Sequence, residues 1–504
     1  MSDIDSPQER SSHSSASFSG DVLKLVSGTT VALMIGVLTS PVIARLFGPE
    51  PIGIFALLSS ITGIFASVFT LEYELAIMLP KDIGDSANLL VGTIGISSLF
   101  SLLTVPLVWF CGPSVAHLLN APLLAKYLWL VPLLLFFGGV TSGHPALNIW
   151  AGRTHRFTQI SITRITGTIT SAVATLVVGL AGFNTSGGLI AGSIVGSIVT
   201  PLMLGWQILR QDYRLFLETV RFSKIWENLK HYHKFALYST PSALMNTVSW
   251  QAPSFLLSAF FSTATVGFFA LSNQLLNVPM NLIGASFSQA FFSHATIANR
   301  DGVLATFVES TFCRLVEYSF FPILMLAVIG KDLFLVVFGT RWVEAGVYVQ
   351  ILSLWMVFWF VSSPMSQLVN VLEKNEFFFR WNIVALVTRV SSIWVGGILG
   401  SSYLAMIFYS VSGALVYGYL SVWIIMKAGC SWRRISKSVL QNLVIFAPAG
   451  GAVFLLKLVQ PFAWVSVVVS IFLVCIYYIY RFKDEYQLRR ILLRVKNLIG
   501  KVNL

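Results

Sequence analysis

Charged side chains are scarce in this sequence. Asp, Glu, Lys and Arg make up 11% of its 504 residues, whereas a soluble domain carries roughly 25%. A water-soluble fold does not fit this composition. Hydrophobic residues make up 56%, and five long stretches have no charged residue at all: 25–44, 127–152, 165–209, 235–299 and 390–426.

Motifs for catalysis and metal binding are also lacking. The four cysteines have neither metal-ligand spacing nor a paired framework; they are Cys111, Cys313, Cys430 and Cys475. No G-x-x-x-x-G-K-[ST] phosphate loop occurs. We therefore expect no enzyme activity, no cofactor and no metal. Nucleic-acid binding is not expected either, because membrane topology accounts for the net charge of +12.

The charge-free stretches predict an all-α polytopic membrane protein. Each is long enough for one or more spans of about 20 residues, and a spanning helix satisfies its backbone polar groups internally. Divided at Gly, Pro, Asn and charged residues, the chain predicts about 14 transmembrane helices. They cover residues 22–46, 50–71, 86–110, 123–147, 157–181, 187–209, 236–260, 267–291, 308–330, 346–370, 377–400, 402–426, 438–457 and 462–480.

The distribution of basic residues supports this count, since Lys and Arg are retained on the cytoplasmic side. Of the 33 Lys and Arg, only five fall on the outer side: Arg45, Lys126, Lys331, Arg341 and Lys457. We therefore expect both termini in the cytoplasm, with residues 1–20 as a disordered tail and 481–504 as a basic one. The basic clusters either reflect topology alone or contact anionic lipid.

An internal repeat divides the predicted bundle. EPIGIFALLSS at residues 50–60 aligns with ATVGFFALSNQ at 264–274, which pairs Gly53 with Gly267. We therefore expect two parallel six-helix lobes, 21–209 and 236–427, joined by a cytoplasmic linker at 210–235, with a C-terminal helix pair at 438–480. Repeated bundles of this kind place a substrate site near the membrane midplane, so transport is the expected function.

One segment also carries a family resemblance. ARLFGPEPIGIFALLSSITGIF, followed by LEYELAIMLPKDIGDSANLL, resembles the Wzx-type polysaccharide biosynthesis proteins, most strongly over residues 44–90. These are O-antigen and exopolysaccharide repeat-unit flippases of the multidrug/oligosaccharidyl-lipid/polysaccharide (MOP) exporter superfamily. The drug-exporting MATE branch shares the architecture. The terminal helix pair is similar to that of lipid-II flippases, where it forms a groove for the lipid tail.

The resemblance implies a function, a location and partners. An undecaprenyl-diphosphate-linked oligosaccharide would move from the cytoplasmic to the periplasmic leaflet of the bacterial inner membrane, for O-antigen, capsule or exopolysaccharide assembly. Alternating access driven by an ion gradient would move it. Membrane lipids, a polysaccharide polymerase and chain-length proteins are the implied partners. The alternative is a MATE-like drug or metabolite/cation antiporter.

Four basic residues are candidates for a cationic substrate cavity. Arg389 is the deepest, and a charge at a helix centre costs about 2.5–3.5 kcal/mol on insertion scales, so it either faces a cavity or pairs with a buried carboxylate. Arg164 and Arg314 either bind phosphate through their planar forks or extend to the cytoplasmic interface. Lys24, which opens the first helix, is the fourth candidate.

Three carboxylates are candidates for gating or proton coupling. Glu72 and Glu74 lie at the C-terminal end of the second span, where the helix dipole disfavours anions, so a cationic partner is expected. They either serve a cytoplasmic gate or proton site, or form a salt bridge that fixes the following loop. Glu317 lies about one turn beyond Arg314 and is expected to neutralise it, an ion site being the alternative.

The seventh and eighth predicted spans are unusually polar. Asn273, Asn277 and Asn281 recur every four residues, and the preceding span offers Asn246. These amides either line a cavity that binds glycan hydroxyls or form hydrogen bonds between helices.

Overall fold

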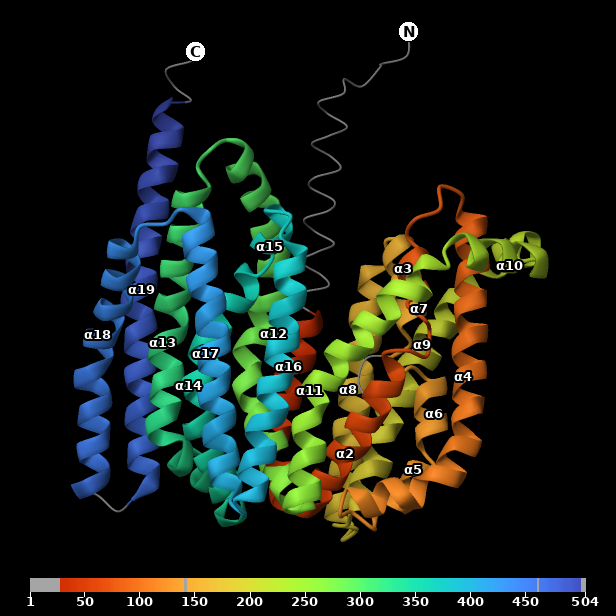
Figure 1. Cartoon of the computed structure of the whole chain (residues 1–504), viewed down its shortest axis with the longest axis horizontal. Coiled ribbons are helices and arrows are strands. Elements are labelled where there is room, and N and C mark those ends of the chain that lie inside the picture. Colours follow the sequence, from red (N-terminus) through yellow and green to blue (C-terminus); the bar gives the residue numbers. More distant parts are fainter. Residues whose placement is uncertain (1–27, 140–142, 460–461, 500–504) are drawn as a thin grey trace. The chain divides into compact units, whose positions relative to one another are not determined.

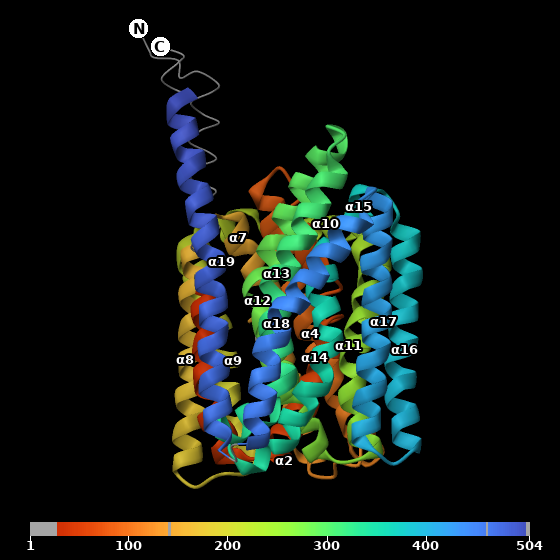
Figure 2. The same cartoon turned by 90° about the vertical axis from the view of Figure 1, so that its left-hand side faces the viewer.

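The computed structural model describes residues 28–139, 143–459 and 462–499, apart from the side chains of 281–286, 289–290, 375 and 482–499. Within these residues every regular element is a helix (Figure 1 and Figure 2). The chain forms two compact units. Unit 1 comprises the described residues through Ser286 together with Phe379–Tyr409, and unit 2 comprises Phe287–Phe378 and the described residues from Ser410 onward.

Unit 1 begins with a helix at Gly28–Phe47. It continues through α2 (Pro49–Ala66), α3 (Tyr73–Ala76), α4 (Ile83–Leu118), α5 (Leu124–Leu128), α6 (Val131–Phe136), α7 (Pro145–Arg153), α8 (Phe157–Leu180), α9 (Ser186–Thr219), α10 (Phe222–His231), the π-helix η1 (Phe235–Ser239), α11 (Thr240–Phe260), the first part of α12 (Thr263–Arg300) and most of α16 (Asn375–Ile398). Unit 2 contains α13 (Leu304–Val337), the 3-10 helix η2 (Thr340–Trp342), α14 (Val343–Met365), α15 (Leu368–Val371), most of α17 (Ser402–Ala428), α18 (Trp432–Val459) and α19 (Ala463–Ile499).

The prediction of an all-α polytopic membrane protein is confirmed. Among the described residues, 11 helices are long and apolar enough to cross a membrane. The helices α11 and α12, with 21 and 38 residues, are long enough to span but do not reach that apolarity. They correspond to the two predicted spans that contain the asparagine-rich face. The lobe boundaries stay a prediction.

The expected continuous helix at 123–147 is wrong. The chain forms the short helices α5 and α6, and α7 starts only at Pro145. Gly138 and Gly139 interrupt the helix with φ values of 94° and 99°, a conformation that glycine adopts without steric cost. Pro145 then restarts the helix at its first position, where a missing N–H costs nothing.

The two aligned repeat segments begin helices at equivalent positions. Helix α2 starts at Pro49 and α12 starts at Thr263, each four residues before the paired glycines Gly53 and Gly267. The predicted linker at 210–235 is largely helical, because α9 continues to Thr219 and α10 follows.

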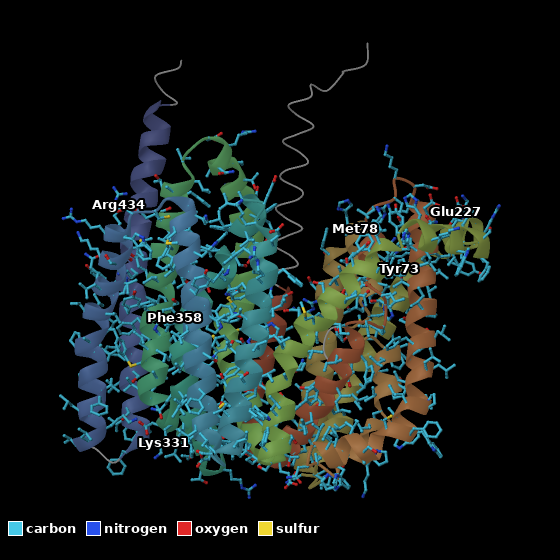
Figure 3. All side chains as sticks on the ribbon, viewed as in Figure 1. Tyr73, Met78, Glu227, Lys331, Phe358 and Arg434 are labelled. Carbon is cyan, nitrogen blue, oxygen red and sulfur yellow. The ribbon has the colours of Figure 1, made fainter. Side chains whose placement is uncertain are left out.

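In unit 2, α18 and α19 pack against α13, and each helix makes a polar contact with it at a different position along its length. Lys457 of α18 lies 3.0 Å from Asp332 of α13. Nearer the start of α13, the Tyr477 hydroxyl of α19 donates a hydrogen bond to the Glu317 carbonyl oxygen at 2.6 Å. Figure 3 labels Lys331 and Arg434 near the two opposite ends of this helix group.

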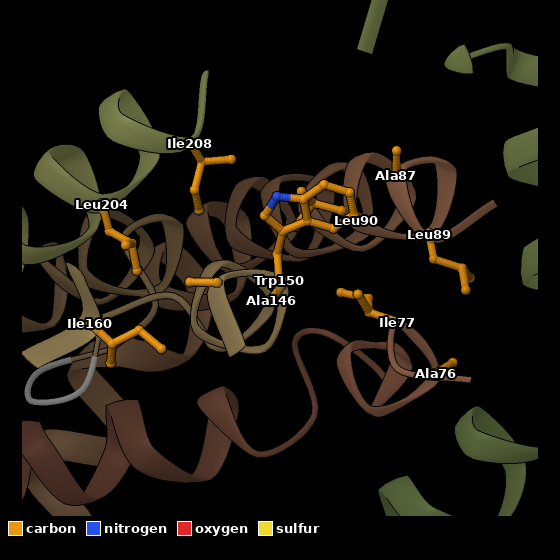
Figure 4. Packing of buried hydrophobic residues seen from close by; sticks show 11 residues of the cluster. Ala76, Ile77, Ala87, Leu89, Leu90, Ala146, Trp150, Ile160, Leu204 and Ile208 are labelled. Atoms are coloured by element: carbon orange, nitrogen blue, oxygen red, sulfur yellow. The ribbon is translucent and has the colours of Figure 1, made fainter. Parts of the chain in front are cut away.

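The core of unit 1 surrounds Trp150 of α7, which has no exposed surface. Leu90 of α4 and Ile208 of α9 belong to the same apolar cluster (Figure 4). The indole nitrogen of Trp150 donates to Asp212 at 2.8 Å, and Arg156 donates two hydrogen bonds to the same carboxylate. The carboxylate is thereby neutralised, and α7, α8 and α9 are held together at one end.

Candidate functional site

Unit 1 contains a cavity of about 370 Å³, a volume in the range of small-molecule sites. The first helix, α2, α8, α9 and the start of α12 surround it. Its described lining residues are Gly36, Thr39, Ser40, Ile43, Ile52, Phe55, Gly143, Arg164, Gly167, Thr168, Ser171, Ala172, Thr175, Leu189, Ser193, Gly196, Ser197, Thr200, Leu271 and Gln274.

Small residues build the wall that α8 and α9 contribute. A Cβ on Gly167 would lie 3.3 Å from the carbonyl oxygen of Gly196, so the two helices approach closely at this pair, as small residues allow in membranes. Hydroxyl side chains follow at helical spacing on both helices and line the cavity: Thr168, Ser171 and Thr175 on α8, and Ser193, Ser197 and Thr200 on α9.

The hydroxyl groups offer the cavity mainly acceptor capacity. Thr168 donates to the Arg164 carbonyl oxygen at 2.9 Å, and Thr200 donates to the Gly196 carbonyl oxygen at 3.0 Å. A hydroxyl that donates to its own helix keeps oxygen lone pairs for another donor. Donors such as sugar hydroxyls therefore match this wall.

Arg164 is the one charged residue among the described residues that line the cavity. It lies on α8 and donates from Nη1 to Thr29 Oγ1 of the first helix at 2.8 Å. A guanidinium carries five N–H donors, so this bond leaves others for a ligand. Burying a charged side chain inside a membrane span costs free energy unless polar groups surround it. The hydroxyl groups of this cavity provide such surroundings for Arg164.

Arg389 is held between two helices. It is 6% exposed on α16, its Nη1 lies 3.0 Å from the Ser249 hydroxyl of α11, and its guanidinium stands 4.2 Å from the ring centre of Trp250. Both contacts join α16 to α11. A role for Arg389 in substrate binding stays a prediction, as does its pairing with a buried carboxylate.

Of the predicted asparagines, Asn246, Asn273 and Asn277 are absent from the described lining of this cavity. Asn273 and Asn277 are half-buried on α12 and Asn246 is exposed on α11, whereas the neighbouring Gln274 reaches the cavity. The side chain of Asn281 lies outside the described residues, as does Lys24. The hydroxyls of α8 and α9 were missed, although their spacing of three and four residues carried the signal.

Glu74 lies buried in α3, after a strained turn. Leu71 and Glu72 before it have φ values of 52° and 58°, a left-handed conformation that is costly for non-glycine residues. Glu74 is 9% exposed, and its Oε2 has no hydrogen-bond partner among the described residues. Burial raises the pKa of the Glu74 carboxyl, while a hydrogen bond from Thr70 opposes that rise.

Glu72 is only half-buried. Burial raises the pKa of its carboxyl, and the nearby charge of Glu74 raises it further. No ion pair with a described Lys, Arg or His is present for either glutamate. The expected cationic partner is therefore not found in the part of the chain that the structure describes.

The expected pairing of Glu317 with Arg314 is wrong. Glu317 lies 3.6 Å from Arg481 of α19, and Arg314 is exposed on α13. The reason is tertiary: α19 packs against α13 and brings its own arginine to the carboxylate. Among the described residues, no group of three His, Cys, Asp or Glu could hold a metal ion.

Residues 42–347, more than half of the chain, match the polysaccharide biosynthesis protein family. The chain belongs to this family. The predicted resemblance is thereby confirmed, and the hydroxyl-lined cavity lies within a member of a polysaccharide biosynthesis family.

Solved transporters have the fold of this family member. The lipid II flippase MurJ, in an inward closed conformation, aligns with a TM-score of 0.70 at 13% identity, over 92% of this chain and 99% of that one. An inward-facing multidrug resistance MATE family transporter of the MOP superfamily aligns with a TM-score of 0.58 at 13% identity, over 80% and 94%. At these identities the similarity establishes a transporter fold alone.

A curated relative is an uncharacterized membrane protein. It lies in the cps region of Klebsiella pneumoniae and is 22% identical to this chain over 192 residues. These residues make up 37% of this chain and 39% of that protein. The chain thus aligns with less than half the length of this relative.

Proposed function

We propose that this protein is a flippase for lipid-linked oligosaccharide repeat units. In this proposal an undecaprenyl-diphosphate glycan passes from the cytoplasmic to the periplasmic leaflet of a bacterial inner membrane, for O-antigen, capsule or exopolysaccharide assembly. Both termini lie in the cytoplasm. A polysaccharide polymerase and chain-length proteins receive the product.

The observation that carries the proposal is the composition of the cavity in unit 1. A single arginine among hydroxyl groups suits a ligand that combines anionic and hydroxyl groups, because a guanidinium binds phosphate or carboxylate oxygens and serine or threonine oxygens accept from sugar hydroxyls. The family and the transporter fold support the same assignment. Arg164 is proposed as the anion-binding residue, and Thr168 and Thr200 as contacts to the glycan.

The alternative is a drug or metabolite/cation antiporter, which the similarity to a MATE transporter supports. An organic cation would be repelled by the positive charge of Arg164 at short range. A site for such a cation would therefore need a carboxylate to offset this charge. The described lining residues include Arg164 and neither Asp nor Glu. We therefore favour an anionic substrate.

We place the coupling proton at Glu74. Its burial and its raised pKa favour the protonated form over a wider pH range than for a solvent-exposed glutamate. An inward proton gradient would then supply the driving force.

The direct test is leaflet transfer by the full-length protein in proteoliposomes. Undecaprenyl-diphosphate oligosaccharide would be incorporated, and its exposure would be followed with membrane-impermeant periodate added outside. We expect faster glycan oxidation with the wild-type protein than with empty liposomes. Arg164→Ala should abolish the gain and Arg164→Lys should retain part of it, whereas Arg210→Ala, at an exposed position of α9, should behave as wild type.

The corresponding test in cells is deletion of the gene in the native host. Surface polysaccharide should fall and lipid-linked repeat units should accumulate, and wild type but not a correctly inserted Arg164→Ala should restore polymer. Transfer of glycan lipid at the empty-liposome rate, together with export of an organic cation, would instead establish the antiporter.

A further inference from the structure

The helix α10 lies outside the spans of unit 1 and runs across the end of α4 (Figure 1). Its first residues are held by Asn88 of α4, which donates to the Thr219 carbonyl oxygen at 3.0 Å and accepts from the Arg221 N–H at 3.0 Å. Asn88 is 2% exposed. One amide thus fixes both sides of the turn between α9 and α10.

The far end of α10 is fixed as well. Asn228 donates to Asp85 at 3.2 Å, and the Tyr73 hydroxyl donates to the Leu229 carbonyl oxygen at 3.0 Å. Close packing adds to these bonds, because a Cβ on Gly92 would lie 2.9 Å from the Ile225 side chain. The orientation of α10 on α4 is therefore determined by the fold.

With this orientation, α10 leaves two aromatic side chains uncovered. Phe222 is 83% exposed and Trp226 is 67% exposed. They are four residues apart and share one face, which also carries the exposed Lys230 one turn further on. Glu227 and Lys224 form an ion pair of 3.1 Å on a different face, and Figure 3 labels Glu227 on this helix.

An exposed apolar stripe on α9 precedes this aromatic face in the sequence. Exposed apolar residues recur along that span every three or four positions, and they are Leu202, Trp206, Leu209, Tyr213 and Leu217. On a membrane-spanning helix such a stripe faces lipid. After the turn at Val220 and Arg221, Phe222 and Trp226 add two further exposed apolar side chains.

The level of α10 along α4 matches the edge of a bilayer. From Gly92, where α10 packs, to Trp109 the helix rises about 25 Å at 1.5 Å per residue. Trp109 and Trp129 form an exposed edge-to-face pair at 5.4 Å, typical of an aromatic belt at a membrane surface. Since the hydrocarbon layer is about 30 Å thick, α10 lies near the opposite surface.

We propose that α10 is an interfacial helix that binds the surface of an acidic bilayer, with Phe222 and Trp226 inserted at the headgroup level and Lys230 contacting acidic phospholipid. Basic residues concentrate in the same segment and are exposed: Arg210, Arg214, Arg221 and Lys234. An amphipathic helix with aromatic and basic residues binds in this way, and clustered basic charge favours anionic lipid. This inference is independent of the transported substrate.

The test places a polarity-sensitive fluorophore on the full-length protein in nanodiscs. Trp226→Cys would be labelled in a background in which the exposed Cys111 and Cys475 and the half-buried Cys313 are serine. Glu227→Cys is the matched control, because it is rotated by about 100° on the same helix. Doxyl-labelled lipid and aqueous iodide are the two quenchers. We expect doxyl lipid to quench the label at position 226 several-fold more than the label at 227, and iodide to do the reverse.

The charge requirement is tested by comparing phosphatidylcholine nanodiscs with nanodiscs that also contain phosphatidylglycerol. Phosphatidylglycerol should increase the lipid quenching at position 226. Lys230→Gln should remove that increase, and Lys224→Gln, on the face turned away, should keep it.

Three outcomes would overturn the proposal. Equal iodide access at positions 226 and 227 means that the aromatic face meets water. Protection of position 226 from both quenchers means that a protein, such as a second copy of this chain, covers it. Lipid quenching that is the same in both lipid compositions removes the role of acidic lipid.

Discussion

Gly53 of α2 and Gly267 of α12 lie against each other at a helix crossing inside unit 1. A Cβ on Gly53 would lie 3.0 Å from the Gly267 nitrogen, and a Cβ on Gly267 would lie 3.1 Å from the Gly53 nitrogen. Each would also overlap a carbonyl oxygen of the other helix, that of Thr263 or Pro49. The contact is reciprocal, and it joins the two positions that the sequence repeat aligns.

This crossing predicts an unusual response to alanine. Gly→Ala in a helix interior is ordinarily stabilising by about 1 kcal/mol, yet Gly53→Ala should destabilise by about 1–3 kcal/mol because the backbones must separate. Gly95→Ala on α4 is the matched control, since its Cβ would meet nothing within 4 Å. Thermal unfolding in detergent should show a lower Tm for the first variant and an unchanged or higher Tm for the second. Equal Tm values would show that the crossing is not tightly packed.

The cavity predicts a specific effect of losing one hydroxyl. Thr168→Val keeps the shape but removes an acceptor from the cavity wall, and a hydrogen bond contributes about 0.5–1.5 kcal/mol. We expect the apparent affinity for glycan lipid to fall about two- to tenfold, with an unchanged Tm. Thr170→Val, two residues further along α8 and absent from the described lining, should retain wild-type transport. An equal loss in both variants would point to a general effect on α8.

Glu74 predicts a pH-dependent stability. Because burial raises its pKa in the folded state, the folded protein holds the proton more tightly than the unfolded chain. Stability therefore falls as the pH rises from the ordinary glutamate pKa through the raised one. Glu74→Gln should raise Tm relative to wild type above this window and change it little below it. Glu218→Gln, at an exposed site, should show no such dependence, and a Tm gain for Glu74→Gln that is the same at every pH would contradict this account.

The ion pair between Lys457 and Asp332 predicts non-additive substitutions. Lys457→Met leaves a largely buried carboxylate without its cation and should cost about 3 kcal/mol or more. Adding Asp332→Asn removes the stranded charge, so the double variant should be more stable than the single one. The Tm values of the wild type, the two single variants and the double variant form the cycle. Additive losses would mean that the pair contributes little.

Much of the fold could be read from composition and periodicity. The charge-free stretches predicted the membrane-spanning class because a spanning helix satisfies its backbone polar groups internally. The asparagine spacing of every four residues on α12, together with Asn246 on α11, marked these two helices as the polar pair. The helix break at Gly138 and Gly139 was missed, since consecutive glycines within an apolar run do not by themselves distinguish a break from a tolerated glycine. The contact between Glu317 and Arg481 was missed for another reason, because the two residues are far apart in the sequence and only packing of α19 on α13 brings them together.

The sequence by itself determined that this chain is a multi-pass helical membrane protein of a polysaccharide biosynthesis family. It could do so because the evidence is local in the sequence: the length of the hydrophobic stretches, their scarcity of charge, and the segment at residues 44–90. That Arg164 lines a cavity was decided only by the tertiary structure. Arg164 lines the cavity among hydroxyl groups, and the deeper Arg389 contacts Ser249 and Trp250. The physical reason is that the depth of a residue follows from its place in the span, while the direction of its side chain depends on how each helix is rotated against its neighbours.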